Sequence, residues 1–276
     1  MITPAEIEKI ANKESLRATQ IEKDYMLSCM LTGISKDKTL NDNLIFKGGT
    51  VLKKFYFDDY RLSEDLDFTL KNKNITKNEI EDLFQNTVES VTQDKGIKLK
   101  LSDISEHQNK NIYFYISYTG PLGGIGRNKE LKVDIATNEL LVFEVNRLKL
   151  FEKYSDDEKC LLNCYSLEEV ITDKMCCLLS RQQPRDFYDI WYLSEIEKID
   201  MSKYLHEFES KAKYKGVNSE NLENRLKHSF PIIKNLWTSN LKALMRDLPP
   251  FEQVSRELNR NLRKVFNNSK KLRLSM

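Results

Sequence analysis

The sequence predicts a protein of the mixed α/β (α+β) class, with a mixed sheet in its first half and helices in its second. Residues 62–70 alternate between apolar and polar side chains, as a strand with one buried face does. From residue 166 onward, apolar side chains recur at helical spacing instead. We therefore expect two domains, residues 1–150 containing the sheet and residues 151–276 that are mainly helical.

The other elements follow from the same periodicities. Helical spacing covers residues 5–35 and 76–94, and a short apolar strand at residues 44–46 stops at a glycine turn before a helix start near residue 51. Three more strands are expected at residues 97–101, 111–118 and 130–136.

The second half contains clear helix start and stop signals. Ser166 and Glu169 form an S-x-x-E capping box, and Pro184 suits the first turn of the next helix. The remainder, residues 200–276, has a helical pattern that breaks at Lys215-Gly216 and at Pro249-Pro250.

The charge balance is close to neutral. The 276 residues contain 44 Lys or Arg and 42 Asp or Glu, a net charge of +2, which is not the strongly basic composition of many nucleic-acid-binding domains. One basic stretch near the C-terminus is either a local nucleic-acid patch or a solvated helix face. It comprises Arg256, Arg260, Arg263, Lys264, Lys270, Lys271 and Arg273.

Several protein classes are disfavoured. No apolar run approaches the roughly 20 residues that span a bilayer, and the N-terminus lacks the basic and apolar segments of a signal peptide. The five cysteines form no C-x-x-C pair, as expected of reduced thiols in a cytoplasmic protein without a membrane partner. With three histidines in the chain, we expect carboxylates to carry the chemistry.

Asp65 and Asp67 are the first candidates. One residue apart on a strand, they project from the same face and repel each other unless a cation lies between them. Mg²⁺, or Mn²⁺ in its place, removes that cost when it is held by one or two carboxylates and by substrate phosphates. A D-x-D pair also occurs on solvated strand edges.

Asp134 is the third carboxylate. It shares the polar face of its strand with Lys132, and a strand placed beside Asp65 and Asp67 would gather three carboxylates around a metal pair. The alternative is the solvent-facing side of an edge strand. Gly48-Gly49-Thr50 adds backbone that a phosphate can approach closely, although a plain tight turn has the same composition.

Lys174 interrupts an apolar helix face and therefore needs an anionic partner. The interrupted face consists of Leu167, Val170, Ile171 and Leu178. A partner from the protein, such as Asp186 or Asp189 on the following helix, would make a structural ion pair. A nucleotide as partner would make Lys174 a triphosphate clamp, and periodicity does not separate the two interpretations.

Five motifs occur in an order and spacing that resembles one known family. They are Ile21-Glu22-Lys23-Asp24-Tyr25-x-Leu27, Gly48-Gly49-Thr50-x-Leu52 with Arg61-x-Ser63-x-Asp65-Leu66-Asp67-Phe68, Lys132-Val133-Asp134, Glu168-Glu169-Val170 with Lys174, and Arg185-Asp186-Phe187-Tyr188-Asp189-Ile190. Over residues 15–195 the chain resembles the AbiEii/AbiGii-type nucleotidyltransferase toxins, relatives of the mycobacterial MenT toxins.

The resemblance implies a polymerase-β-like nucleotidyltransferase palm followed by a helical domain. It also implies NTP and Mg²⁺ as ligands, a cognate antitoxin as partner, and a role in a toxin–antitoxin or phage-defence system. Relatives add nucleotides, often pyrimidines, to the 3′ end of tRNA and block aminoacylation. The other hypotheses are nucleotidylation of a small molecule or of a protein such as the antitoxin, and a non-catalytic nucleotide-binding protein.

Carried over by position, the resemblance assigns the site residues. The metal ligands are Asp65, Asp67 and Asp134. The residues that bind the NTP are Gly48, Gly49, Thr50, Lys53, Arg61, Ser63, Lys174, Arg185 and Asp186, with Asp186 or Asp189 completing the catalytic site. Thr50 stands where the wider superfamily commonly has serine, and it keeps the hydroxyl.

Overall fold

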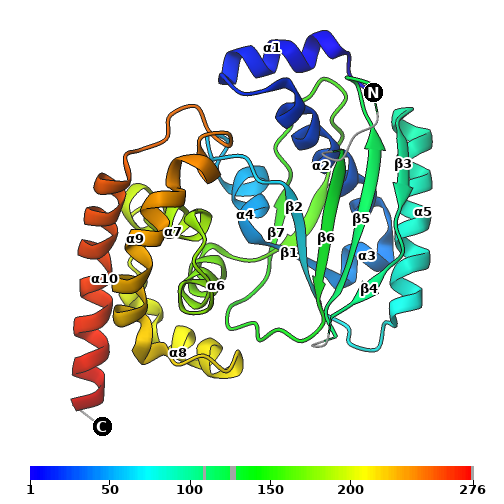
Figure 1. Ribbon diagram of the computed structural model, residues 1–276. Coiled ribbons are helices and arrows are strands. Elements are labelled where there is room, and N and C mark those ends of the chain that lie inside the picture. Colours follow the sequence, from blue (N-terminus) through cyan, green and yellow to red (C-terminus); the bar gives the residue numbers. More distant parts are fainter. Residues whose placement is uncertain (108–109, 125–128, 275–276) are drawn as a thin grey trace. The chain divides into compact units, whose positions relative to one another are not determined.

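The computed structural model describes residues 1–107, 110–124 and 129–274, with side chains up to residue 267 (Figure 1). The chain forms two compact units, one made of Met1–Glu139 and Val145–Tyr165, the other of Leu140–Glu144 and Ser166–Met276. Residues 151–165, which the sequence assigns to the helical half, thus lie in the first unit. They do so because strand β8 (Leu161–Cys164) pairs in parallel with β1 (Leu44–Lys47).

The first unit is built on a mixed sheet of eight strands, which confirms the expected fold class. The strand order is β3-β5-β6-β2-β1-β8-β7, with β4 paired to β5. The remaining strands are β2 (Asp65–Leu70), β3 (Lys98–Leu101), β4 (Ser105–Glu106), β5 (Ile112–Thr119), β6 (Glu130–Ala136) and β7 (Asn146–Lys149). The sequence analysis did not predict β4, β7 and β8, which are segments of two to four residues.

The helical spacing at residues 5–35 is divided between two helices. Ser15 adopts a left-handed conformation (φ 55°) and its N–H closes the last turn of α1, so the chain restarts at α2. The helices of this unit are α1 (Pro4–Glu14), α2 (Ala18–Lys36), α3 (Lys38–Asn43), α4 (Gly48–Val51) with one π-helical turn η1 (Leu52–Tyr56), and α5 (Lys77–Lys95).

One face of the sheet is covered by α2 and α5, which pack against each other (Figure 1). Phe84 of α5 meets Phe114 of β5 edge to face, with ring centroids 4.8 Å apart. Phe114 lies opposite Val133 of β6, which lies opposite Leu66 of β2, and all three are buried on this face. Because side chains alternate along a strand, the polar residues of β2, β5 and β6 project from the other face.

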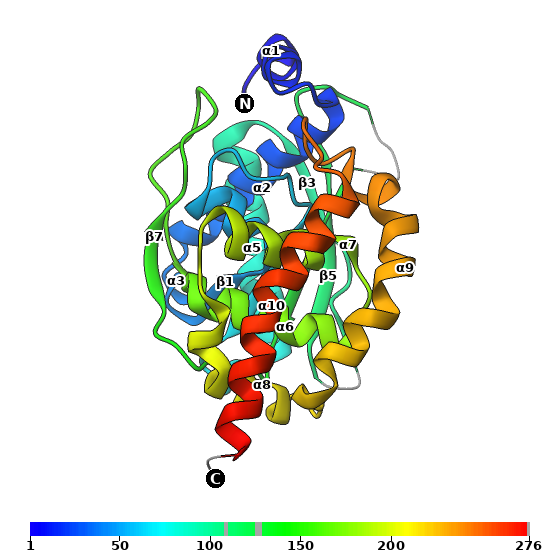
Figure 2. The same cartoon turned by 90° about the vertical axis from the view of Figure 1, so that its left-hand side faces the viewer.

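The second unit is helical, as expected. Its elements are α6 (Leu167–Ser180), α7 (Pro184–Trp191), η2 (Tyr192–Ile196), η3 (Met201–Tyr204), α8 (Leu205–Tyr214), η4 (Ser219–Asn221), α9 (Leu222–Leu241) and α10 (Phe251–Leu274). The expected starts at Ser166 and Pro184 are confirmed, and so are the breaks, because Gly216 has a φ of 68° and Pro249-Pro250 separate α9 from α10. Figure 2 shows α10 beside α9.

One residue of the C-terminal basic stretch forms an ion pair within the second unit. Arg260 contacts Glu195 at 2.6 Å, whereas the side chains of Lys270, Lys271 and Arg273 lie outside the described residues. In the described part of the chain, no helix has the length and apolar character needed to cross a membrane.

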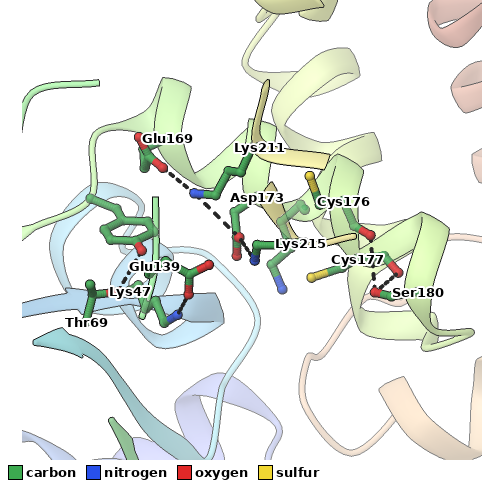
Figure 3. A network of polar contacts seen from close by, with 12 residues as sticks. Lys47, Thr69, Glu139, Glu169, Asp173, Cys176, Cys177, Ser180, Lys211 and Lys215 are labelled. Carbon is green, nitrogen blue, oxygen red and sulfur yellow. Dashed lines mark hydrogen bonds and ion pairs between the residues drawn. The ribbon is translucent and has the colours of Figure 1, made fainter. Parts of the chain in front are cut away.

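Glu169 joins Leu140–Glu144 to the helices of the second unit. Its carboxylate accepts hydrogen bonds from the N–H groups of Val142 (2.9 Å) and Phe143 (2.8 Å), and Lys211 donates to it (Figure 3). The capping box predicted from the sequence is therefore half formed, because Ser166 caps the helix but Glu169 reaches away from it. Both Glu169 and Lys211 are almost fully buried.

Replacing Lys211 by methionine would leave the Glu169 carboxylate buried without its cation. We expect Lys211→Met to lower the free energy of unfolding by about 3–5 kcal/mol in urea titrations. Lys215→Met is the matched control, because Lys215 is partly exposed and contacts Asp173, so its loss should cost about 1 kcal/mol or less. Equal losses in the two variants would contradict this assignment.

Candidate functional site

Two carboxylates meet on the sheet face opposite α2 and α5. Strands β2 and β6 are parallel neighbours, with Asp67 directly opposite Asp134. On the other side of β2, antiparallel β1 places Lys47 opposite Asp67. These three side chains line a cavity of about 620 Å³. Its remaining lining residues are His107, Asn111, Ile135 and Ala136.

Asp65 lies on the same face, two positions from Asp67 and opposite Lys132. The expected cluster of three metal-binding carboxylates is not assembled, since the described residues contain no group of three side chains gathered for metal binding. Asp134 instead contacts Lys132, with Nζ and Oδ2 2.5 Å apart. Burial lowers the pKa of Lys132, but its hydrogen bond to Asp134 and the nearby charge of Asp65 outweigh burial and raise it.

The Gly48-Gly49 turn holds the strand end against Asp67. Gly48 has a φ of 82°, and a Cβ there would lie 2.3 Å from Oδ2 of Asp67. A Cβ on Gly49 would lie 2.8 Å from Nη2 of Arg61 and 3.3 Å from Oγ of Ser63. The two glycines are therefore required by close packing and, at Gly48, also by backbone conformation.

The residues around this turn lie behind the cavity. Thr50 is 1% exposed, and its hydroxyl donates to the backbone carbonyl of Asp65 at 2.6 Å. Arg61 is also buried and donates to its neighbour's carbonyl, while Lys53 donates to the carbonyl of Asp58. Burial lowers the pKa of Lys53. The lining of the described cavity does not include Thr50, Lys53, Arg61 or Ser63.

Sequence reasoning missed Lys47, His107 and Asn111. Lys47 contacts Glu139 at 2.5 Å and lies 5.8 Å from the ring centre of Tyr165 (Figure 3). Its place immediately before Gly48, at the end of a strand, is the signal that could have identified it. Nothing near His107 or Asn111 in the sequence marks them, because the pairing of β4 with β5 brings them to the cavity.

The donors at the cavity fit a hard divalent cation. Mg²⁺ binds oxygen ligands and takes one or two carboxylates plus substrate phosphates, which Asp67 and Asp134 match without a third protein ligand. Asp67 packs directly against the turn at Gly48, which fixes its carboxylate beside the cavity.

In the second unit, Lys174 has its anionic partners within the protein. Its Nζ lies 2.8 Å from Oδ1 of Asp186 and 2.8 Å from Oδ2 of Asp189, and all three side chains are buried. Arg181, which the sequence analysis missed, adds two hydrogen bonds to Asp186 at 2.7 and 3.0 Å. Burial favours a raised pKa for Asp186, but the charges of Lys174 and Arg181 hold that pKa well below its usual range.

The model of the AbiEii family, described as a nucleotidyltransferase toxin of type IV toxin–antitoxin systems, matches residues 30–264. The chain therefore belongs to this family of nucleotidyltransferase toxins, which act on NTPs and are paired with an antitoxin. No sequence among the curated proteins matches it significantly.

Two solved structures share the fold. MenT4, a nucleotidyltransferase toxin of Mycobacterium tuberculosis, aligns with a TM-score of 0.62 at 14% identity, over 98% of this chain and 93% of its own. JHP933 from Helicobacter pylori aligns with a TM-score of 0.53 at 17% identity, over 94% of this chain and 98% of its own. At these identities the likeness concerns the fold alone.

Gly48→Ala tests the packing of the turn against Asp67. We expect it to abolish nucleotidyl transfer, because the new Cβ displaces the carboxylate, and to destabilise the protein by about 1–2 kcal/mol for the left-handed backbone. Gly96→Ala is the matched control, since Gly96 also has positive φ (63°) but open space around its Cβ position. It should show a similar stability loss with full activity. Full activity in Gly48→Ala would contradict the assignment.

The pH dependence of the free energy of unfolding, compared between wild type and Asp186→Asn, tests the buried ion pair. The carboxyl pKa is lower in the folded protein, so Asp186 stabilises the fold above about pH 4 and loses that effect as pH falls through the folded pKa. The variant should be about 3 kcal/mol less stable at pH 7, and the gap should narrow toward pH 3 in urea titrations. The exposed Asp247→Asn should differ little from wild type throughout. A gap for Asp186→Asn that stays constant with pH would argue against the charge effect.

Proposed function

We propose that this toxin is a magnesium-dependent enzyme of the cytoplasm that transfers a nucleoside monophosphate, from a pyrimidine NTP, to the 3′ end of tRNA. The transfer releases pyrophosphate and blocks translation. The observation that carries the proposal is the alignment of Asp67 and Asp134 at one register of two parallel strands, lining a single cavity. The choice of tRNA and of a pyrimidine rests on the family resemblance.

Asp67 and Asp134 would hold Mg²⁺, which neutralises charge on the transferring phosphoryl group when bound. Gly48 lets the turn pack directly against the carboxylate of Asp67, which keeps that carboxylate at the cavity. Lys47, at the β1 side of the cavity, adds a cation that a triphosphate can recruit from Glu139. A cavity of about 620 Å³ falls within the size range of small-molecule sites.

The other predicted residues receive two kinds of role. We assign Thr50, Arg61 and Ser63 to positioning the turn and β2, because all three are buried. Asp65 adds negative charge beside the metal-binding pair. Family resemblance assigns Lys174 and Arg185 to the NTP, with Asp186 or Asp189 completing the site, and the ion pair that Lys174 forms within the protein gives it a structural role besides.

The test is label transfer from each α-labelled NTP to total tRNA in the presence of Mg²⁺. We expect label from one pyrimidine NTP, none after chelation, and a loss of about 10²-fold or more in Asp67→Asn, because the metal supplies several kcal/mol of charge stabilisation. Asp59→Asn, an exposed aspartate in the same unit, should transfer label like wild type. Full transfer by Asp67→Asn would overturn the proposed site.

RNase treatment of the labelled product distinguishes an RNA acceptor from a protein or a small molecule. A product that RNase destroys identifies RNA as the acceptor. Label that persists on the antitoxin or on a small molecule would refute the RNA acceptor while keeping the transferase chemistry.

A further inference from the structure

Aromatic side chains lie beside the carboxylates, on the β5 side of the cavity. His107 stacks on Tyr113, with ring centroids 4.2 Å apart and an interplanar angle of 23°. Tyr113 is opposite Asp134, and His107 is exposed and lines the cavity. The backbone of His107 donates a hydrogen bond to the carbonyl of Asn111 (2.8 Å) and accepts one from the N–H of Lys110 (2.8 Å). The aromatic pair thus borders the candidate metal-binding residues.

A second row of side chains continues this surface. Tyr115 of β5 is 39% exposed and lies opposite Lys132, whose ammonium contacts Asp134 at 2.5 Å. Lys98 and Lys100 of β3 are exposed and project from the same face, since Lys100 lies opposite Ser117 in the strand register. Exposed rings interleaved with lysines are the side chains that bind single-stranded nucleic acid, since bases stack on rings and phosphates pair with cations.

The chemistry decides which substrate this surface takes. In an in-line displacement at phosphorus, the attacking oxygen and the leaving pyrophosphate lie on opposite sides of the transferred group. Lys47 lies on the β1 side of the carboxylates, lines the cavity and suits the phosphates that leave. The attacking oxygen then enters from the opposite side, where β5 lies next to β6.

We propose that the His107–Tyr113 pair stacks the terminal nucleotide of a single-stranded RNA 3′ end, and that Tyr115 with Lys132 and Lys100 binds the nucleotides that precede it. This acceptor surface rests on the proposed function and adds the residues that hold the RNA. His107 and Tyr115 are its exposed aromatic members, and neither carries the metal or the phosphates.

The experiment measures RNA binding and transfer separately. Binding is followed by fluorescence anisotropy with a labelled single-stranded RNA of about 8 nucleotides, in an Asp67→Asn background that prevents turnover. Transfer by otherwise wild-type protein gives KM for tRNA and for NTP. The variants are His107→Ala, Tyr115→Ala and Tyr115→Phe, with Tyr214→Ala as control because Tyr214 is a tyrosine of similar exposure (44%) in the helical unit.

We expect His107→Ala and Tyr115→Ala each to weaken RNA binding and raise KM for tRNA by about fivefold or more, the effect of losing one stacked base. KM for NTP should stay unchanged. Tyr115→Phe keeps the ring and should retain binding, as should Tyr214→Ala.

Two results would overturn the acceptor surface while leaving the proposed function standing. One is unchanged RNA binding and unchanged KM for tRNA in both alanine variants. The other is a rise in KM for NTP alone, which would assign the aromatic pair to the base of the NTP. Wild-type protein that labels no RNA would instead refute the proposed function, and the acceptor surface with it.

Discussion

The register between β2 and β6 is the constraint on which the candidate site depends. Side chains alternate with a period of two, so a slip by one residue would bury Asp67 or Asp134 and expose their apolar neighbours. Leu66, Val133 and Ile135 are each fully buried beneath α2 and α5, which makes such a slip costly. The hydrophobic core therefore sets the position of the carboxylates, and Gly48 admits Asp67 beside the turn.

Both units contain buried ion pairs. In the first unit, the carboxylate of Asp24 is 1% exposed, contacts Lys54 at 2.8 Å and accepts a hydrogen bond from Tyr154 at 2.7 Å. In the second, Lys174 and Lys211 have their anionic partners in the same unit. Such pairs add little net stability compared with apolar packing, but removing one partner leaves an uncompensated charge. We infer that they fix one arrangement of the helices, a hypothesis that the lysine and aspartate variants test.

Periodicity predicted the elements that carry the carboxylates, because β2, β5 and β6 are long enough to show alternation. The arrangement of Asp134 beside Asp67 followed from one assumption, that their strands are neighbours, and the strand register bears this out. Lys47 escaped attention because its partner, Glu139, is 92 residues away and no local pattern links them. For Lys174 the sequence named Asp186 and Asp189 as candidate partners, but helical periodicity did not decide between them and a nucleotide.

The motif at residues 21–27 contains ionisable side chains of types that can bind substrate, but here they form contacts within the protein. Glu22 accepts a hydrogen bond from the N–H of Leu122 and contacts Lys129, each at 2.8 Å, and Tyr25 donates to Asp156 at 2.8 Å. Motif resemblance alone does not distinguish such residues from those that bind substrate. Within one motif region burial and partners differ, since the buried Thr50 hydroxyl donates to the carbonyl of Asp65 whereas Asp67 lines the cavity.

We propose that Asp67 and Asp134 together hold a divalent cation with the NTP. The most direct measurement is electron paramagnetic resonance of Mn²⁺ in the presence of a non-hydrolysable NTP analogue, comparing wild type with Asp67→Asn and Asp134→Asn. We expect a signal from protein-bound Mn²⁺ in the wild type and a marked loss of that signal in each variant. Circular dichroism should show that both variants keep the fold. Undiminished Mn²⁺ binding in both variants would contradict it.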